Sequence, residues 1–315
     1  MIKNKKAISI LLVGAMLFST IIVVMPAWAS SPTIHVHSGQ SIQAAVNSAV
    51  EGSTIIVHEG VYDEFVGVGK PLTLKGIKAT IQQLDGNAFA MGSSGISISG
   101  FTIRSGAVAI DVGGDWQGGT ITDNTIYADI IGVGINHPSN IVISNNVIHS
   151  TYPVYLFQEA SNIIIQNNVL YADVNPGSIG IWMAYPKNPT IVGNTIYSNW
   201  FGVNLGRSDG AIVASNKITA AEIGIHIYGT RSLVLQNTIR GSFWSGIYLG
   251  SVWNTENDYS SSYNAVLSNT IVGDNAQSSY GVLLVEYTHD NVVAKNRISG
   301  VETAVLDKGI NNIVI

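Results

Sequence analysis

A short motif recurs along the sequence, and its variable position carries residues that could bind or convert a sugar. The motif reads Gly, then Val or Ile, then any residue, then Leu or Ile, as in residues 224–227. Aromatic faces pack on the C–H faces of sugar rings, while amides and imidazoles bind hydroxyl groups. On a plain β-surface the same side chains would only support cross-strand stacking, so both interpretations stay open. In the five copies of the motif in the middle of the chain, the variable position holds Tyr155, Trp182, Asn204, His226 and Tyr248.

Four residues in this region have the chemistry of a lyase or epimerase acting on a uronic acid. Such a reaction needs a cation near the carboxylate, a base for the C5 proton and often a Tyr as the acid. His226 is the candidate base, because the pKa of an imidazole suits neutral pH. Tyr248 is the candidate acid, and Arg207 or Arg231 is the candidate cation.

Glycoside hydrolysis is the less favoured reaction. It needs two carboxylates about 5 to 9 Å apart, and Asp209 with Glu222 or Glu256 is the nearby supply. The enzyme interpretation therefore favours a polysaccharide lyase or epimerase, with a non-catalytic binding module as its alternative. The candidate substrate-binding residues are Tyr155, Trp182, Asn204, Tyr228, Trp253, Asp209 and Glu256.

Metal binding is not expected. His35 and His37 place two imidazoles on one strand face, a donor set that suits copper. However, the sequence has no Cys, and beyond residue 30 its Met residues are Met91 and Met183. We therefore expect no cofactor, with calcium bridging of acidic sugars by Asp258 or Glu256 as the alternative.

The elements that must position these residues form a repeat of about 22 residues. In each unit an Asn lies two residues before an aliphatic residue, and a period of this length indicates stacked supersecondary units. Asn tolerates the left-handed region that a sharp corner needs, and stacked Asn amides can bond one another in a ladder. The Asn residues are Asn124, Asn146, Asn168, Asn194, Asn216, Asn237, Asn269 and Asn296.

Each unit contains three short β-type segments and no helical periodicity. An apolar strand precedes the Asn, a second strand follows it, and the Gly-containing motif forms the third. Alternation within each segment turns every second side chain inward. Three strands and three turns account for about 22 residues, which predicts an all-β, single-stranded parallel β-helix of about ten coils.

Composition and the amino terminus set the domain organisation. The 315 residues are 46% hydrophobic and only 11% charged, with a net charge of −5, which excludes a basic nucleic-acid-binding surface. Residues 1–29 have the pattern of an export signal, either cleaved after Ala29 or kept as a membrane anchor. Residues 30–52 would form an amino-terminal cap with a short amphipathic helix over residues 41–50, and residues 53–315 the β-helix.

The repeats resemble those of right-handed parallel β-helix proteins with the pectin-lyase-like fold. The start of the repeat region, residues 41–50 followed by 54–57, 60–62 and 71–74, is similar to the NosD-type group, which is associated with carbohydrate binding and sugar hydrolysis. The resemblance implies a right-handed helix whose substrate groove lies on the outer face of the Gly-motif strand. Extra residues at 172–179, 250–263 and 273–280 flank that strand and would build the walls of a cleft.

These observations together predict an exported protein that binds a polysaccharide. It would be a lyase or epimerase on acidic polysaccharide, a non-catalytic cell-surface structural or adhesion module, or a periplasmic NosD-like accessory protein. We expect it to be secreted, periplasmic or at the cell surface, with an extracellular or cell-envelope polysaccharide as partner and no nucleic acid. Contact with a membrane would involve only an uncleaved amino-terminal segment. The uncapped carboxyl-terminal coil could associate end to end with another chain.

Overall fold

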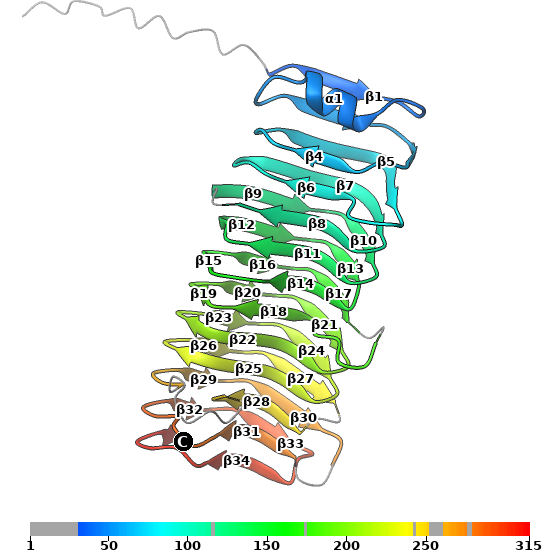
Figure 1. Ribbon diagram of the computed structural model, residues 1–315. Helices are drawn as coiled ribbons and strands as arrows, with labels where there is room; N and C mark the ends of the chain where they lie inside the picture. The colour runs from blue at the N-terminus through cyan, green and yellow to red at the C-terminus, as the bar shows by residue number, and fades with distance from the viewer. Residues whose placement is uncertain (1–30, 115–116, 173–174, 242–243, 252–260, 276–278) are drawn as a thin grey trace, which may run out of the picture. The chain divides into compact units, whose positions relative to one another are not determined.

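The described part of the chain is a stack of short coils that follow one another in sequence order. The structure is a computed structural model, and it describes residues 31–114, 117–172, 175–241, 244–251, 261–275 and 279–315. Figure 1 shows the coils succeeding one another from the blue to the red end of the chain. Among the described residues no helix is long and apolar enough to cross a membrane. The predicted signal, residues 1–29, lies outside the described residues.

Three columns of parallel strands run through the stack. Column B contains the apolar strands that precede the repeated Asn, and its members pair in parallel with the same register in successive coils. Its strands are β1 (Thr33–Val36), β2 (Thr54–Val57), β5 (Thr73–Gln83), β7 (Ile96–Ser105), β9 (Gln117–Thr122), β12 (Ser139–Ser144), β16 (Ile164–Gln166), β20 (Thr190–Val192), β23 (Ile212–Ala214), β26 (Leu233–Leu235), β29 (Ala265–Leu267), β32 (Val292–Ala294) and β35 (Ile313–Val314).

Column C contains the strands that follow the Asn. The long strands β5 and β7 turn the corner and contribute to columns B and C alike. The other strands of column C are β3 (Gly60–Tyr62), β10 (Thr125–Ala128), β13 (Val147–His149), β17 (Val169–Ala172), β21 (Thr195–Ser198), β24 (Lys217–Ala220), β27 (Thr238–Gly241), β30 (Thr270–Gly273) and β33 (Arg297–Ser299).

Column A contains the Gly-motif strands and carries the candidate site. Two strands of two residues, β15 (Ala160–Ser161) and β19 (Pro186–Lys187), lie at the corner between columns A and B. The strands of column A are β4 (Val66–Val68), β6 (Phe89–Met91), β8 (Val108–Gly113), β11 (Ile131–Asn136), β14 (Tyr152–Leu156), β18 (Ile181–Ala184), β22 (Phe201–Asp209), β25 (Ile223–Thr230), β28 (Ser245–Leu249), β31 (Tyr280–Leu284) and β34 (Thr303–Asp307).

The fold prediction is confirmed. The chain forms a right-handed parallel β-helix of about 12 turns with one helix, against the ten coils counted from the sequence. The count falls short because the first coils, built on β1 and β2, lack the Asn signature. The inward aliphatic column, which includes Ile126, Ile148 and Ile196, is fully buried in a continuous core.

The repeated Asn residues form the predicted ladder inside the stack. Asn146 Nδ2 donates to Asn168 Oδ1 at 3.0 Å, and Asn168 Nδ2 donates to Asn194 Oδ1 at 3.0 Å. Each Oδ1 also accepts from the backbone N–H of the Asn one coil earlier, as Asn168 does from Asn146 at 2.9 Å. These buried amides are therefore fully engaged in joining one coil to the next.

The conformational reason given for the Asn residues needs correction. The left-handed backbone lies at the residue before each ladder Asn, for example Asn145 (φ 57°), Asn167 (φ 55°) and Gln236 (φ 55°). The ladder Asn itself turns its side chain into the stack, where Asn168 Nδ2 also donates to the carbonyls of Ile143 and Gln166. Asn recurs here because both its donors and its acceptor are used, rather than because it tolerates a positive φ.

The Gly of the motif has a packing role. A Cβ on Gly224 would lie 2.4 Å from Ile239 Cγ2 and 2.5 Å from the backbone oxygen of Gly246. A Cβ on Gly180 or Gly202 would clash in the same way with a buried Ile side chain of column C. Because no real Cβ approaches its neighbours so closely, these three coils cannot take a larger residue at this position without a shift of columns A and C.

The amino-terminal cap contains α1 (Ile42–Ser48), as the sequence predicts. Its face of Ile42, Ala45 and Val46 is buried against the first coils. The carboxylate of Glu64, from the following coil, accepts from the backbone N–H groups of Ile42 (2.6 Å) and Gln43 (3.2 Å). It thereby satisfies donors that the first turn of a helix leaves free.

Candidate functional site

The outer face of column A carries a single row of residues, one from each coil. Parallel register places the variable position of the motif in neighbouring coils side by side, as Trp182 opposite Asn204 and His226 opposite Tyr248. We call this set the motif row: Asp111, Gly134, Tyr155, Trp182, Asn204, His226, Tyr248 and Leu283.

The register corrects one coil of the sequence alignment. The sequence prediction put Ala109 in the row, but Asp111 is the residue opposite Gly134, and Ala109 is fully buried. Ala109 takes the position of the motif Gly, which is Gly132 in the next coil. Had Ala been allowed in place of Gly and Val in the fourth position, residues 109–112 would have matched the motif with Asp111 at its variable position.

His226 is buried and held from both sides. Its side chain lies with Nε2 at 2.7 Å from the Gly250 oxygen and Nδ1 at 2.8 Å from Asn204 Oδ1. Burial lowers the pKa of His226 to about 4, although the bond to Gly250 opposes the shift. The near-neutral pKa expected for a base at this position is therefore wrong.

A neutral ring fixes the tautomer of His226. Because a backbone oxygen only accepts, Nε2–H must donate to Gly250, which leaves Nδ1 as an acceptor. Asn204 must then present its amide N–H to Nδ1, an orientation reached by exchanging its amide oxygen and nitrogen. The pair Asn204 and His226 thus forms a closed polar contact between two coils.

Tyr248 is also removed from solvent. Its hydroxyl donates to the Ser251 oxygen at 3.1 Å, and its ring meets the His226 ring at 5.2 Å between centroids. Burial, followed by the negative charge of Glu286, raises the pKa of Tyr248 to about 12. Together with Ile223 and Leu283 it belongs to a small hydrophobic cluster outside the main core. This end of the motif row is packed rather than open.

The other half of the row is partly exposed and aromatic. Tyr155 meets Trp182 at 4.7 Å and Phe157 at 4.4 Å between ring centroids, and Tyr152 lies 5.4 Å from Tyr155. Phe157 is 44% exposed. Burial, with a contribution from Tyr152, raises the pKa of Tyr155. We call Tyr152, Tyr155, Phe157 and Trp182 the aromatic patch.

The two candidate arginines lie near the ends of column A strands: Arg207 is within β22, and Arg231 directly follows β25. Arg207 is exposed, its guanidinium lies 5.2 Å from the ring centroid of Tyr185, and its Nη1 donates to the Tyr185 hydroxyl at 2.5 Å. Arg231 forms an ion pair with Asp209, whose other oxygen accepts from Thr230 at 3.2 Å. Arg231 is therefore already neutralised by the carboxylate that the sequence assigned to substrate binding.

The remaining predicted residues are only partly placed. Tyr228 is buried and lies opposite Gly206. Strand β22 separates its strand, β25, from the Trp182 strand β18. Trp253 and Glu256, together with most of the predicted cleft wall at 250–263, lie outside the described residues. Sequence reasoning missed Phe157 and Tyr185 as site residues, because neither occupies the variable position of the motif.

A second line of aromatic residues lies on the outer face of column C. Tyr127, His149, Tyr171 and Tyr197 stack in successive coils at 5.0, 4.3 and 5.1 Å between centroids, with interplanar angles of at most 12°. Arg104 lies over the free face of Tyr127 at 4.8 Å. Because the ring faces cover one another, this ladder offers edges rather than faces to a sugar.

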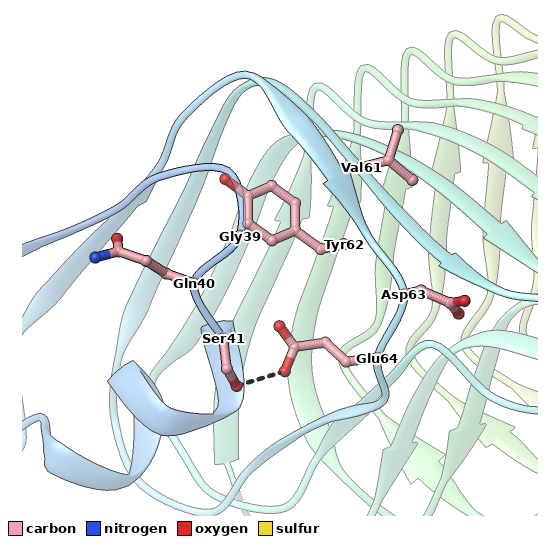
Figure 2. A pocket seen from close by; sticks show the side chains of 7 residues that line it. All are labelled: Gly39, Gln40, Ser41, Val61, Tyr62, Asp63 and Glu64. Carbon is pink, nitrogen blue, oxygen red and sulfur yellow. Dashed lines mark hydrogen bonds between the residues drawn. The ribbon is translucent and has the colours of Figure 1, made fainter.

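A surface pocket of about 300 Å³ lies at the amino-terminal cap (Figure 2), in coils distant in sequence from the aromatic patch. Its lining includes Tyr62, Asp63 and Glu64. The Glu64 carboxylate already accepts from Ser41 Oγ at 2.8 Å and from the first turn of α1. This pocket therefore follows from the capping of the helix by Glu64.

The three-strand coils, the Asn ladder and the outer row on column A define a right-handed parallel β-helix of the pectin-lyase-like class. DFA-IIIase from Arthrobacter chlorophenolicus A6, in complex with GF2, is similar over 93% of this chain and 92% of its own, at 13% identity and a TM-score of 0.71. The A-module of the mannuronan C-5 epimerase AlgE4 from Azotobacter vinelandii is similar over 87% and 94%, at 18% identity and a TM-score of 0.64.

A third similar structure is PfbA, a surface adhesin of Streptococcus pneumoniae, which covers 87% of this chain and 84% of its own at 14% identity and a TM-score of 0.61. At these identities the likeness shows the fold alone. No curated protein matches the sequence. The chain belongs to the NosD family: the family model described as "Periplasmic copper-binding protein (NosD)" matches residues 46–259.

The family description raises the question of which residues could hold copper. Among the described residues, no group of three or more His, Cys, Asp or Glu side chains is arranged to hold a metal ion. The sequence has no Cys, and Met91 and Met183 are buried in the core. The donor chemistry that suits copper is that of His35, His37 and His58, whose rings stack on one another rather than converging on one point.

Proposed function

We propose that this protein is an exported polysaccharide-binding protein whose binding face is the aromatic patch on column A. The observation that carries the proposal is the partly exposed cluster of Tyr152, Tyr155, Phe157 and Trp182 on adjacent coils. Successive coils lie about 4.8 Å apart and each presents one side chain in the row, so a sugar chain lying along the row would contact successive rings. The edge-to-face contacts leave parts of the ring faces uncovered, unlike the ladder on column C.

An acidic polysaccharide is the favoured ligand. Arg207 lies within β22, the strand paired with the Trp182 strand, and it is exposed beside the ring of Tyr185. A guanidinium held against an aromatic ring is oriented to bind a carboxylate. Arg231 contributes less, because Asp209 already pairs with it.

Binding without proton transfer by His226 is the form of the proposal that the geometry supports best. His226 and Tyr248 are each only 3% exposed, and their pKa values of about 4 and about 12 are poor for acid–base work near neutral pH. We infer that both residues support the motif row from within. The surface adhesin among the similar structures is consistent with a non-catalytic role.

A lyase or epimerase activity is the second candidate, and Asp111 is the observation that favours it. Asp111 lies in the motif row with only Gly134 between it and Tyr155, and burial raises the pKa of its carboxyl. Among the described residues no hydrogen bond or ion pair holds this carboxylate. A carboxyl group in this state could move a proton to or from a uronate bound beside it.

The family and the neighbours support a location outside the cytoplasmic membrane. The matching family model is described as periplasmic, and one similar structure is a surface adhesin. The amino-terminal pattern of residues 1–29 agrees with export. A NosD-like accessory role in the periplasm is compatible with glycan binding.

The binding test uses purified protein with polygalacturonate, alginate and a neutral glucan as probes. We expect Tyr155→Ala and Phe157→Ser each to weaken binding of an acidic chain by about tenfold, since a lost aromatic contact costs up to about 1.5 kcal/mol. Tyr197→Ala, which removes an exposed ring of the column C ladder, is the matched control and should bind normally.

Catalysis is tested on the same samples by unsaturated uronate, reducing ends and the ratio of C5 epimers. Turnover lost in Asp111→Asn with binding retained would establish the enzyme candidate. Binding to no polysaccharide, or binding unchanged in both patch variants, would remove the proposed function.

A further inference from the structure

We propose that Asp111 and the ring of Phe157, which flank Gly134 on the outer face of column A, bind the free amino group of an amino sugar. The site rests on the function proposed above, since it needs a sugar chain lying along the motif row, and it adds the chemistry of one sugar in that chain. Carboxylates of the same chain would lie farther along the row, toward Arg207. The bound polysaccharide would therefore carry amino groups as well as carboxyl groups.

Gly134 allows an aromatic ring to approach the carboxylate. It pairs with Asp111 in the coil before and with Tyr155 in the coil after. Because Gly134 has no side chain, the Phe157 ring reaches over it, and a Cβ at this position would lie 3.3 Å from Phe157 Cε2. Coils lie about 4.8 Å apart, so a cation bound by Asp111 would have this ring one coil away, inside the roughly 6 Å over which an aromatic ring attracts a cation.

The carboxylate of Asp111 lacks the partner that a cation would supply. Its residue is partly buried, and no hydrogen bond or ion pair to another described residue holds it. Burial raises the pKa of the Asp111 carboxyl, because the ionised form has lost part of its hydration. An ammonium group beside it would replace that lost interaction with a charge-assisted hydrogen bond.

The aromatic rings beside Asp111 suit both parts of an amino sugar. Phe157 is 44% exposed, Tyr155 is partly exposed, and their rings lie 4.4 Å apart between centroids at an angle of 54°. Rings tilted in this way leave face area free for the C–H face of a sugar ring and for its ammonium group. An N-acetyl group is neutral, so it would gain neither the ion pair nor the cation–π contact.

The part of the chain that carries the aromatic patch has acidic side chains and no strongly basic ones. From residue 105 to residue 186 the sequence contains six Asp or Glu and no Lys or Arg, although Arg104 and Lys187 border this segment. Arg207, the cation of the proposed function, lies four strand pairings from Asp111 along column A. An ammonium group beside Asp111 therefore meets a negative field and no competing side-chain cation nearby in the row.

An organic cation suits this place better than a metal ion. Ca²⁺ takes six to eight oxygen ligands, whereas the motif row here offers the one carboxylate of Asp111. Among the described residues no group of three or more His, Cys, Asp or Glu is arranged to hold a metal ion. A carboxylate beside aromatic rings is instead the donor set that recognises an ammonium group.

The test is calorimetric titration of the full chain with glucosamine oligomers and with N-acetylglucosamine oligomers of the same length, at about pH 6, where amines are charged. We expect the free-amine oligomer to bind at least about tenfold more tightly than the acetylated one. Asp111→Asn should remove this preference by weakening the free-amine oligomer at least about tenfold, with the acetylated one changed less than about twofold. Polygalacturonate has no amine, so Asp111→Asn should not weaken its binding.

Phe157→Leu separates the cation–π contact from apolar packing. Leu keeps an apolar side chain of similar bulk but has no π face, so the preference for the free amine should fall by about threefold or more. Circular dichroism shows whether each variant has folded.

Asp123→Asn is the matched control. It removes one exposed carboxylate from the same segment, at the corner before column C, and Asn tolerates the φ of 57° there. Its affinities for both oligomers should equal those of the unchanged chain.

Equal affinity of the unchanged chain for the two oligomers would overturn the proposal. Equal losses in Asp111→Asn and Asp123→Asn would also overturn it, because they would show a diffuse attraction between charges. If Tyr155→Ala weakens polygalacturonate binding while the free amine is not preferred, the proposed function stands without the amino-sugar site. Binding of the unchanged chain to none of these sugars would remove both.

Discussion

His226 illustrates how a residue suited to catalysis by type can be made inert by its surroundings. Its ring is enclosed between Asn204 and the Gly250 carbonyl, and burial keeps it neutral. A neutral buried imidazole with both nitrogens engaged is a rigid spacer between coils rather than a proton carrier. Its main effect is therefore on stability, in a manner that depends on pH.

We expect the free energy of unfolding to fall as the pH is lowered from about 7 to about 4. In this window the unfolded chain protonates His226, with an ordinary pKa of 6.5, while the folded chain, with a pKa of about 4, does not. Stability is therefore full above pH 6.5 and is lost progressively toward pH 4, by roughly 3 kcal/mol from this residue. Urea denaturation at a series of pH values measures the slope.

The matched variant for this slope is His226→Gln, which keeps a polar side chain and removes the titrating group. It should be less stable at pH 7 but show a flatter dependence between pH 4 and 6.5. His137→Asn removes an exposed imidazole and should keep the full slope. A His226→Gln profile parallel to that of the unchanged chain would contradict the assignment.

At the residue scale the sequence predicted which residues share a row better than it predicted their environment. Trp182, Asn204, His226 and Tyr248 do lie side by side. The motif pattern cannot show that the row is packed at one end and open at the other, because this depends on side chains such as Ile223 that lie outside the motif. Asp111 falls outside the sequence motif because its coil has Ala109 in place of the motif Gly and Val112 in place of the final Leu or Ile.

At the scale of the strand and its corner, two neighbouring Asn residues do different work. Asn167 is exposed and has the left-handed backbone, at φ 55°, whereas Asn168 is buried in the ladder. Asn168 donates to Asn194 and to two carbonyls, and it accepts from Asn146. Loss of the Asn168 side chain therefore leaves several buried polar groups without a hydrogen-bond partner.

We expect Asn168→Gly to reduce the free energy of unfolding by at least about 3 kcal/mol, because each buried polar group left without a hydrogen-bond partner costs about 1 to 3 kcal/mol. Asn167→Gly should change it by less than about 1 kcal/mol, since Gly adopts a positive φ freely. Chemical denaturation of the two variants gives the comparison. Equal losses in both would show that the corner, and not the ladder, supplies the stability.

The elements themselves were largely predictable from the sequence. The spacing of the Asn residues predicts the length of one coil. The alternation of Ile141, Ile143 and their equivalents predicts which side chains point into the core. The reason for the recurring Gly was not predictable from spacing, because the clash of a Gly224 Cβ with Ile239 joins residues from different coils. The stacking of His58 on His37 was not predictable for the same reason, because the two rings meet only through strand pairing.

At the scale of the whole molecule, each coil contacts its two neighbours and little else. The strand pairings link each coil only to the adjacent one along all three columns. Stability in such an array is close to a sum of coil terms and nearest-neighbour terms. Substitutions in the aromatic patch should therefore leave the distant coils, such as the one that carries His35 and His37, unaffected.

Nearest-neighbour coupling can be measured with paired ladder variants. We expect Asn146→Gly and Asn168→Gly, which break one shared bond, to cost together about 1 kcal/mol less than the sum of their separate effects. Asn146→Gly with Asn269→Gly, separated by four intervening ladder residues, should be additive within about 0.5 kcal/mol. Denaturation of the single and double variants provides both cycles, and strong coupling of the distant pair would reject the neighbour-only description.

The stacked ladder on column C gives the molecule an optical property. Tyr171 and Tyr197 hold their rings 9° from parallel and 5.1 Å apart, in a fixed and handed arrangement imposed by the twist between coils. Their near-ultraviolet transitions are therefore coupled, and the coupled pair rotates polarised light in a way that separate tyrosines do not. The chain thus carries an intrinsic chromophore that reports whether neighbouring coils remain in register.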